Sequence, residues 1–388
     1  MKKVLFERFG GLGDVAPVMV AARNYKKKYP DAQIDIALRC DGPVVQSDLL
    51  KGVPWVNKAL DFVQIGPWGT RGIRYKHGVR NIESVYKDYD EVFDYMFITE
   101  GNNTCRHNPI NKPLDEWKAS RNSNWINWYD QHLMWVNIDP NKVSDEDKRP
   151  EFYITKDEEK YANIFDGYKK VVLINPGASS CARTWYPHKF EQLVKETIEK
   201  VESSLVGVWD QKKNKWCFYD KSGEQNIDID VSSAIRKTMI YIYYANLYIG
   251  VDTGFTHVAE GFNKKHIALY STVPWWTRAK YYKHQTHIDP GETNPEFYTF
   301  TLGAGDPLRI KDGIDTMSKR EKRLEELYKA GTESKVAAEI LDTDVIGLDM
   351  EFKALKDKIS SFHRQQSKAL SGVKVSDVFN KIKELLNV

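Results

Sequence analysis

The sequence predicts an α/β protein of two domains, each built on a mainly parallel sheet. At 388 residues the chain exceeds the usual size of a single hydrophobic core. Short apolar strands alternate with amphipathic helices from residue 4, and the same alternation starts again near residue 170. Hydrophobic residues make up 41% and charged residues 29%, a composition typical of ordered globular domains.

The first domain is predicted from a strand–helix–strand unit near the amino terminus. Its helix is closed by Pro30, which cannot continue a helix. The polar run 137–149 ends at Pro150 and marks the expected boundary of a domain covering residues 1–150. The expected strands are 4–6, 34–38 and one within 92–98, and the expected helices are 15–29 and one in the aromatic stretch 117–135.

The second domain, 151–310, repeats the pattern, and a charged helical extension, 311–388, follows it. Right-handed crossovers between parallel strands would place a ligand at the strand ends. The expected strands are 170–174, 204–208, 247–251 and 265–270, and the expected helices are 187–201, 235–246 and one opened by His257. In the extension we expect helices at 318–330 and 349–367 and a closing amphipathic helix capped by Ser376.

Composition restricts the class of protein. The formal net charge of +3 does not by itself indicate nucleic-acid binding. The four cysteines lie far apart without zinc-ligand spacing, so we expect free thiols. The amino terminus lacks the apolar region of a signal peptide, and no apolar run approaches the ~18 residues of a membrane span. We therefore expect a cytoplasmic protein, with peripheral contact with the inner membrane left open.

The first segment with chemical potential is Gly10-Gly11-Leu12-Gly13-Asp14, directly after the first strand. Glycines allow a tight turn there, and Asp14 at the start of a helix is either a general base facing a cleft or an ordinary helix cap. Dinucleotide binding is a weak alternative, because the glycine spacing departs from G-x-G-x-x-G.

A second segment, Asn175-Pro176-Gly177-Ala178-Ser179-Ser180-Cys181-Ala182-Arg183-Thr184-Trp185, links a strand to a helix. Its small residues, hydroxyls and arginine suit a diphosphate, although an ordinary loop with a surface arginine fits equally well. The third segment, Gly250-Val251-Asp252-Thr253-Gly254-Phe255-Thr256-His257, again joins a strand to a helix. It offers backbone donors for an anion, or simply a capped helix with a structural histidine.

Taken together and in this order, the three segments resemble the bacterial heptosyltransferase-like glycosyltransferases of family nine. The resemblance covers roughly residues 1–275 and returns at 375–386. It implies the GT-B fold, two Rossmann-like domains facing a cleft, and sugar transfer from a nucleotide-sugar with inversion and without a metal or other cofactor. An ADP-linked donor is slightly favoured. The implied roles are Asp14 as base with Gly11 and Gly13 beside it, Ser179, Ser180 and Arg183 at the diphosphate, Asp252, Thr253, Gly254 and His257 at the donor, and Asp210 at the donor ribose.

The chain departs from the family pattern in several places. Arg183 stands where the family normally has lysine, which would make a diphosphate contact bidentate. After the strand 265–270 the chain reads Ser-Thr-Val-Pro-Trp-Trp in place of the family's Phe-Gly-Pro-Thr. Residues 290–370 have no counterpart in the family, and they are a packing insertion, a pair of oligomerisation helices or an acceptor-binding addition.

A basic and aromatic patch in the first domain is the candidate acceptor surface. Arg71, Arg74 and Lys76 stand near Trp68 and Tyr75 in a stretch without acidic residues. The patch would suit lipopolysaccharide phosphates or a nucleic-acid backbone, and the alternative is a solvated loop.

The preferred acceptor is accordingly lipopolysaccharide or another surface glycan. Three further hypotheses remain open: a viral-type transferase acting on a hydroxylated base in DNA, a nicotinamide oxidoreductase, and a non-catalytic scaffold that retains the fold.

Overall fold

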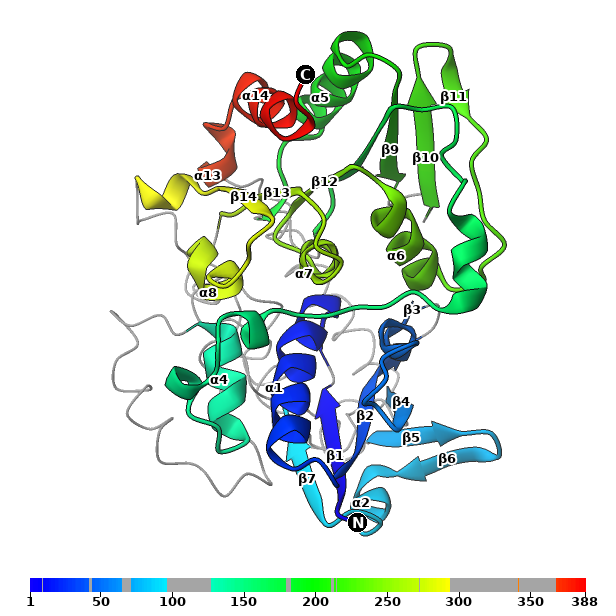
Figure 1. The fold of residues 1–388 in the computed structure, drawn as a ribbon, viewed down its shortest axis with the longest axis vertical. Coiled ribbons are helices and arrows are strands. Elements are labelled where there is room, and N and C mark those ends of the chain that lie inside the picture. Colours follow the sequence, from blue (N-terminus) through cyan, green and yellow to red (C-terminus); the bar gives the residue numbers. More distant parts are fainter. Residues whose placement is uncertain are drawn as a thin grey trace.

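The computed structural model describes residues 1–8, 10–41, 44–64, 71–95, 127–178, 183–210, 213, 215–271, 273–293, 341 and 368–388. These residues form two α/β domains that face one another, with the first domain lower and the second upper in Figure 1. The helices predicted at 318–330 and 349–367 lie outside the described residues, as do 96–98 and 117–126.

The first domain is built on a sheet with strand order β6-β5-β4-β2-β1-β7, with β3 paired to β2. The central strand β1 pairs in parallel with β2 on one side and with β7 on the other. Its elements are β1 (Lys3–Arg8), α1 (Val15–Lys28), β2 (Gln33–Asp41), β3 (Val44–Val45), β4 (Lys58–Gln64), β5 (Arg71–Tyr75), β6 (Gly78–Asn81), α2 (Ile82–Tyr86), β7 (Glu91–Asp94) and α4 (Trp128–Trp135), with the 3-10 helices η1 (Leu12–Asp14) and η2 (Gln46–Leu50).

The second domain has a sheet of order β11-β10-β9-β8-β12-β13-β14. Strands β9, β8, β12, β13 and β14 are parallel, whereas β10 and β11 are antiparallel additions at one edge. Its elements are β8 (Lys170–Asn175), α5 (Pro187–Lys200), β9 (Ser204–Asp210), β10 (Lys215–Asp220), β11 (Gly223–Gln225), α6 (Ala234–Tyr244), β12 (Leu247–Val251), α7 (Gly254–Gly261), β13 (His266–Leu269), α8 (Trp275–Ala279), β14 (Gln285–Ile288), α13 (Lys368–Ser371) and α14 (Val375–Leu386).

The central strands are apolar because both of their faces are covered. In β8, Leu173 packs on the α6 and α7 side, and Val172 and Ile174 pack on the α5 and α14 side. Such strands read as continuous apolar runs, which is why they are visible in the sequence. One apolar cluster extends from α1 of the first domain to α6 and α7 of the second, so the domains share part of their core.

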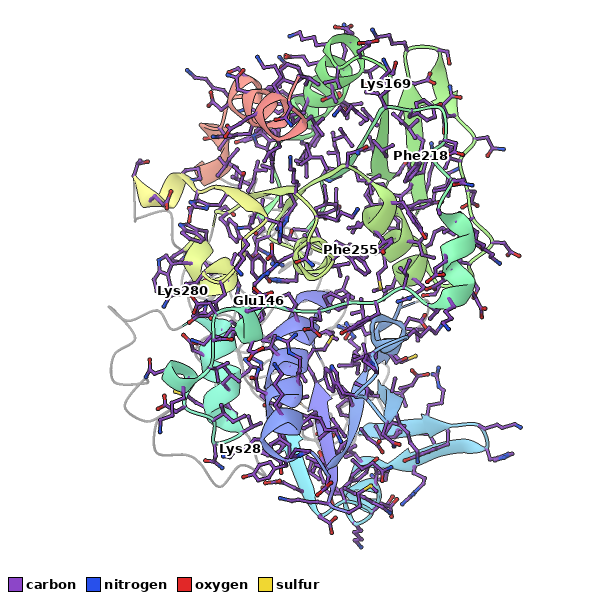
Figure 2. All side chains as sticks on the ribbon, viewed as in Figure 1. Lys28, Glu146, Lys169, Phe218, Phe255 and Lys280 are labelled. Carbon is purple, nitrogen blue, oxygen red and sulfur yellow. The ribbon has the colours of Figure 1, made fainter. Side chains whose placement is uncertain are left out.

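The chain crosses between the domains in the stretch predicted as the boundary, and there it is held by a buried ion pair and by further polar contacts. Arg149 donates to the fully buried Glu260 of α7 (2.6 Å), and Arg23 of α1 donates to the Arg149 carbonyl (2.8 Å). Glu146 lies on this crossing segment in Figure 2 and pairs with Lys283 of the second domain. The polar run is therefore anchored to both domains.

Several predicted elements need correction. The helix α7 begins at Gly254 and not at His257, and α14 begins after Lys374 with no side-chain cap, so Ser376 lies inside the helix. The stretch 71–81 is a hairpin, β5–β6, which projects to the side of the sheet in Figure 1. The sheets are mixed because of such antiparallel edges.

Candidate functional site

The candidate site is formed where the carboxyl ends of the two sheets face each other. The ends of β9, β8 and β12 lie side by side, since Ile174 pairs with Val208 and Gly250 pairs with Asn175. Neighbouring strands are about 5 Å apart, so the segments that follow these strands converge on one edge. The glycine turn after β1 approaches this edge from the first domain, where η1 contacts α7. In each domain this edge includes the end of a central strand, β1 or β8, on whose two sides the chain connections run in opposite directions. Open α/β sheets bind ligands at such positions.

Asp14 is held at the end of η1 by two interactions. Its Oδ1 accepts from the guanidinium of Arg8 (2.8 Å), and its Oδ2 accepts from the Gly11 backbone N–H. Its side chain does not cap α1, but through Gly11 it caps the first turn of η1. The carboxylate keeps 14% of its side chain exposed, whereas Arg8 is almost completely buried. The carboxylate is therefore fixed in direction and still open to solvent.

Close approach of the domains explains Gly254, and Gly13 lies at the same contact. A Cβ on Gly254 would lie 2.6 Å from the Leu12 Cβ and 2.8 Å from the Gly13 backbone N, so only glycine fits at the first position of α7. A Cβ on Gly13 would lie 3.4 Å from the His257 ring. The glycine turn of the first domain and the start of α7 in the second domain are thus in direct contact.

His257 is a buried, neutral histidine. Its Nδ1 is hydrogen-bonded to the Tyr282 hydroxyl and lies 3.4 Å from the hydroxyl of Tyr129, which comes from the first domain. Burial lowers the pKa of His257 to about 4, and the Asp252 carboxylate acts in the opposite direction. The side chain joins the domains and presents a neutral imidazole beside Gly13.

Arg183 and Asp252 are brought together. The Arg183 Nη1 donates to the Asp252 carbonyl (3.1 Å) and lies 3.5 Å from its carboxylate. Asp252 is 6% exposed and Arg183 is partly exposed, so the pair places a cation beside the start of α7. Thr253 precedes the helix without capping it through its side chain. Ser179 and Ser180 lie outside the described residues.

Asp210 ends β9 and accepts from the Lys213 backbone N–H (3.1 Å). The preceding residue, Trp209, lines a cavity of about 560 Å³ together with residues of β10, β11 and α6. The cavity was not predicted because no strand was expected at 215–225, although Trp216, Cys217 and Phe218 form a short buried run there. The lining residues are Trp209, Lys215, Trp216, Cys217, Glu224, Gln225, Asn226, Ile227, Asp228, Val231, Ser232, Ala234, Lys237 and Tyr241.

The residues of the basic patch are spread along the β5–β6 hairpin. Arg71 pairs with Gln64 at the carboxyl end of β4, near the site edge. Arg74 is further along and donates to the Cys40 sulfur (3.4 Å), and Lys76 lies in the exposed turn at the opposite end. Trp68 lies outside the described residues. The structure therefore brings Arg71 towards the site and leaves Lys76 far from it.

Cys40 and Cys217 are free thiols, as predicted, and Cys105 and Cys181 fall outside the described residues. Within the described part of the chain, no three His, Cys, Asp or Glu side chains cluster as a metal site would require. None of the helices there combines the length and hydropathy of a membrane span.

Two Rossmann-like domains that face each other through their strand ends define the GT-B class of glycosyltransferases. The model of glycosyltransferase family 9 (heptosyltransferase) matches residues 139–297, which identifies a family 9 domain there and confirms the resemblance over that stretch. The protein is a glycosyltransferase.

Solved structures confirm the fold. The chain is similar to the ADP-heptose lps heptosyltransferase II of E. coli, with 14% identity and a TM-score of 0.55 over 100% of this chain and 99% of that one. It is also similar to a family 9 glycosyl transferase of Veillonella parvula, with 13% identity and a TM-score of 0.51 over 88% and 97% of the two chains. Among curated protein sequences, none matches the chain significantly.

Proposed function

We propose that this protein transfers a sugar from a nucleoside-diphosphate donor to an acceptor hydroxyl, with inversion at the anomeric carbon and without a metal or other cofactor. The observation that carries the proposal is the placement of Asp14. A fixed, partly exposed carboxylate on one domain lies across from the strand ends and the helix start of the other. Such an arrangement separates a base from a leaving-group site, as inverting transfer requires.

The donor diphosphate is assigned to the edge formed by Arg183, Thr253 and Gly254. Arg183 supplies a cation, and the first backbone N–H groups of α7 supply donors at the positive end of the helix. Asp252 orients the guanidinium. Ser179 and Ser180, in the segment that follows β8, remain proposed diphosphate contacts.

The nucleoside end of the donor is assigned to the cavity beside Trp209. Trp209 and Trp216 provide aromatic surfaces against which a base can pack, and Asp210, the last residue of β9 and the neighbour of Trp209, is the proposed acceptor for ribose hydroxyls. All lining residues come from the second domain. This assignment leaves the region beside Asp14, where the two domains meet, for the sugar and the acceptor.

Transfer then proceeds in one displacement. The acceptor oxygen attacks the anomeric carbon while Asp14 takes the hydroxyl proton, and the bond between that carbon and the phosphate oxygen breaks. The nucleoside diphosphate leaves with the electron pair, and Arg183 with the α7 N–H groups stabilises the charge that develops. Attack opposite the leaving group inverts the configuration.

We propose a surface glycan of the lipopolysaccharide type as the acceptor and an ADP-linked sugar as the donor. Support comes from the family 9 match and from the E. coli enzyme, whose name specifies ADP-heptose and lps. Arg71, near the site edge, is the proposed contact for acceptor phosphates. A cytoplasmic protein that touches the inner membrane peripherally would suit such an acceptor.

A thermal-shift panel tests the donor assignment. Purified protein is heated with ADP-, UDP-, GDP- and CMP-linked sugars, with NAD as a control, because a ligand that binds only the folded state raises the melting temperature. Stabilisation by one nucleotide-sugar, followed by release of its nucleoside diphosphate, supports the proposal. Stabilisation by NAD alone, or by none of these compounds, contradicts it.

A further inference from the structure

Each residue from 127 to 130, at the start of α4, contacts a residue of the second domain. Asn127, which caps the helix, donates to the Trp276 carbonyl (2.7 Å), and the Tyr129 hydroxyl is hydrogen-bonded to that of Tyr282. Asp130 accepts from the Tyr281 hydroxyl (2.7 and 2.8 Å). We call this contact between residues 127–130 and 276–282 the α4–α8 interface. In Figure 1 α8 lies above α4, and the interface joins the two domains at this pair of helices.

Arg278 lies at the centre of the α4–α8 interface. Its guanidinium carbon is 3.7 Å from the centre of the Trp128 ring, and the two side chains are 2% and 6% exposed. A guanidinium that is desolvated on an indole ring makes one of the stronger cation–π contacts in proteins. Burial lowers the pKa of Arg278 to about 9, and the nearby Asp14 carboxylate opposes this shift. Arg278 is thus within electrostatic reach of Asp14 although the two belong to different domains.

A continuous set of contacts leads from Trp128 to Asp14. His132, one turn further along α4, donates from Nδ1 to the Trp128 carbonyl (2.8 Å), and its ring stacks on Tyr95 at 4.9 Å with 4° between the planes. The Tyr95 carbonyl accepts from Arg8, and Arg8 pairs with Asp14. Every side chain between Trp128 and Asp14 is buried. A shift of α4 is therefore transmitted through packed side chains to Asp14.

We propose that Arg278 is a positioning residue for Asp14: by fixing Trp128 and the first turn of α4, it holds the Tyr95–Arg8 support on which the carboxylate rests. The inference deepens the proposed function, because it assigns a residue of the donor domain to the orientation of the base. It also means that the carboxylate is set in place only when the two domains are in contact.

The test compares Arg278→Gln with Arg278→Lys and with Tyr281→Phe. Arg278→Lys keeps the charge and loses the flat stacking, and it provides a second variant in case the first does not fold. Tyr281→Phe removes hydrogen bonds from the same interface but lies off the route to Asp14. We expect both Arg278 variants to slow nucleoside diphosphate release by about 2- to 30-fold, the range of couplings through packed side chains, with unchanged donor affinity. Tyr281→Phe should keep the wild-type rate.

A double variant separates positioning from general loosening. In an Asp14→Asn background the base is already lost, so adding Arg278→Gln should slow release by less than about 2-fold. An equal slowing in both backgrounds would overturn the proposal, as would a slowing that Tyr281→Phe reproduces.

Hydrogen exchange gives a readout that needs no activity. Arg278→Gln should speed amide exchange in residues 10–14, whereas Tyr281→Phe should not, and exchange in β10 should stay unchanged in both. If the wild-type protein releases nucleoside diphosphate from no donor, the proposed function fails, and faster exchange at 10–14 still supports the structural coupling. Unchanged exchange at 10–14 in a folded Arg278→Gln protein overturns the inference, whatever the activity.

Discussion

Replacing Gly254 by alanine tests whether the two domains meet as closely as the structure shows. The added Cβ would lie 2.6 Å from the Leu12 Cβ and 2.8 Å from the Gly13 backbone N. Carbon atoms in contact normally stay about 3.5–4.0 Å apart, so α7 and η1 must separate by about 1 Å. Overpacking of this kind costs about 1–3 kcal/mol, and the higher helix propensity of alanine offsets at most about 1 kcal/mol of it.

Moving the domains apart relieves this strain. The substitution therefore weakens binding at the site that the two domains form together. We expect the Gly254→Ala protein to bind its nucleotide-sugar at least about 5-fold more weakly and to melt a few degrees lower. Calorimetric titration with the donor selected by the thermal-shift panel measures the first effect, and a melting curve measures the second.

Gly372→Ala is the matched control, because nothing lies within 4 Å of its added Cβ. This variant should match the wild type in both measurements. If Gly254→Ala behaved like Gly372→Ala in affinity and in melting temperature, the close approach of η1 and α7 would be refuted, and with it the assembled site.

Two further predictions concern buried charges. Arg149→Met leaves the fully buried Glu260 without its ion-pair partner and should lower the free energy of unfolding by about 3–5 kcal/mol in urea titrations; a loss below about 1 kcal/mol would show that the pair is dispensable. His132 and His257 have pKa values of about 3 and 4, below the ~6.5 of unfolded histidine, so the unfolded chain binds more protons between pH 6.5 and 4. Stability should be full above pH 6.5 and fall by about 2 kcal/mol per histidine by pH 5.0, as unfolding at pH 7.5 and 5.0 measures; a His132→Phe protein with the same pH dependence would contradict this origin.

The alternation of strands and helices is well predicted from the sequence because the central strands of both sheets are covered on both faces. Runs such as 171–174 and 247–251 can only be buried strands, and the segments that follow them necessarily share one edge of the sheet. The meeting of the glycine turn with Gly254 also agrees with the resemblance, although no local pattern fixes the distance between the two domains.

What the sequence could not predict depends on contacts between distant residues. Arg8 ends an apolar strand, and its burial makes sense only once the Tyr95 carbonyl and Asp14 are beside it. Likewise, Arg278 reads as a surface residue until Trp128, far away in the chain, covers it. The β10–β11 edge was missed for a different reason: its apolar run, 216–219, is short, and the charged and polar residues on both sides of it resemble a loop.

The role of Asp14 as the base is tested most directly by the rate of nucleoside diphosphate release from the Asp14→Asn protein, measured together with donor affinity. Asp90→Asn serves as the control, since this carboxylate accepts from the Lys3 backbone at the opposite end of the sheet (2.7 Å). We predict that Asp14→Asn slows release by about 10²–10⁴-fold with donor affinity within about 2-fold of the wild type, and that Asp90→Asn changes neither. A rate for Asp14→Asn comparable to that of the wild type would remove Asp14 from the mechanism and contradict the account.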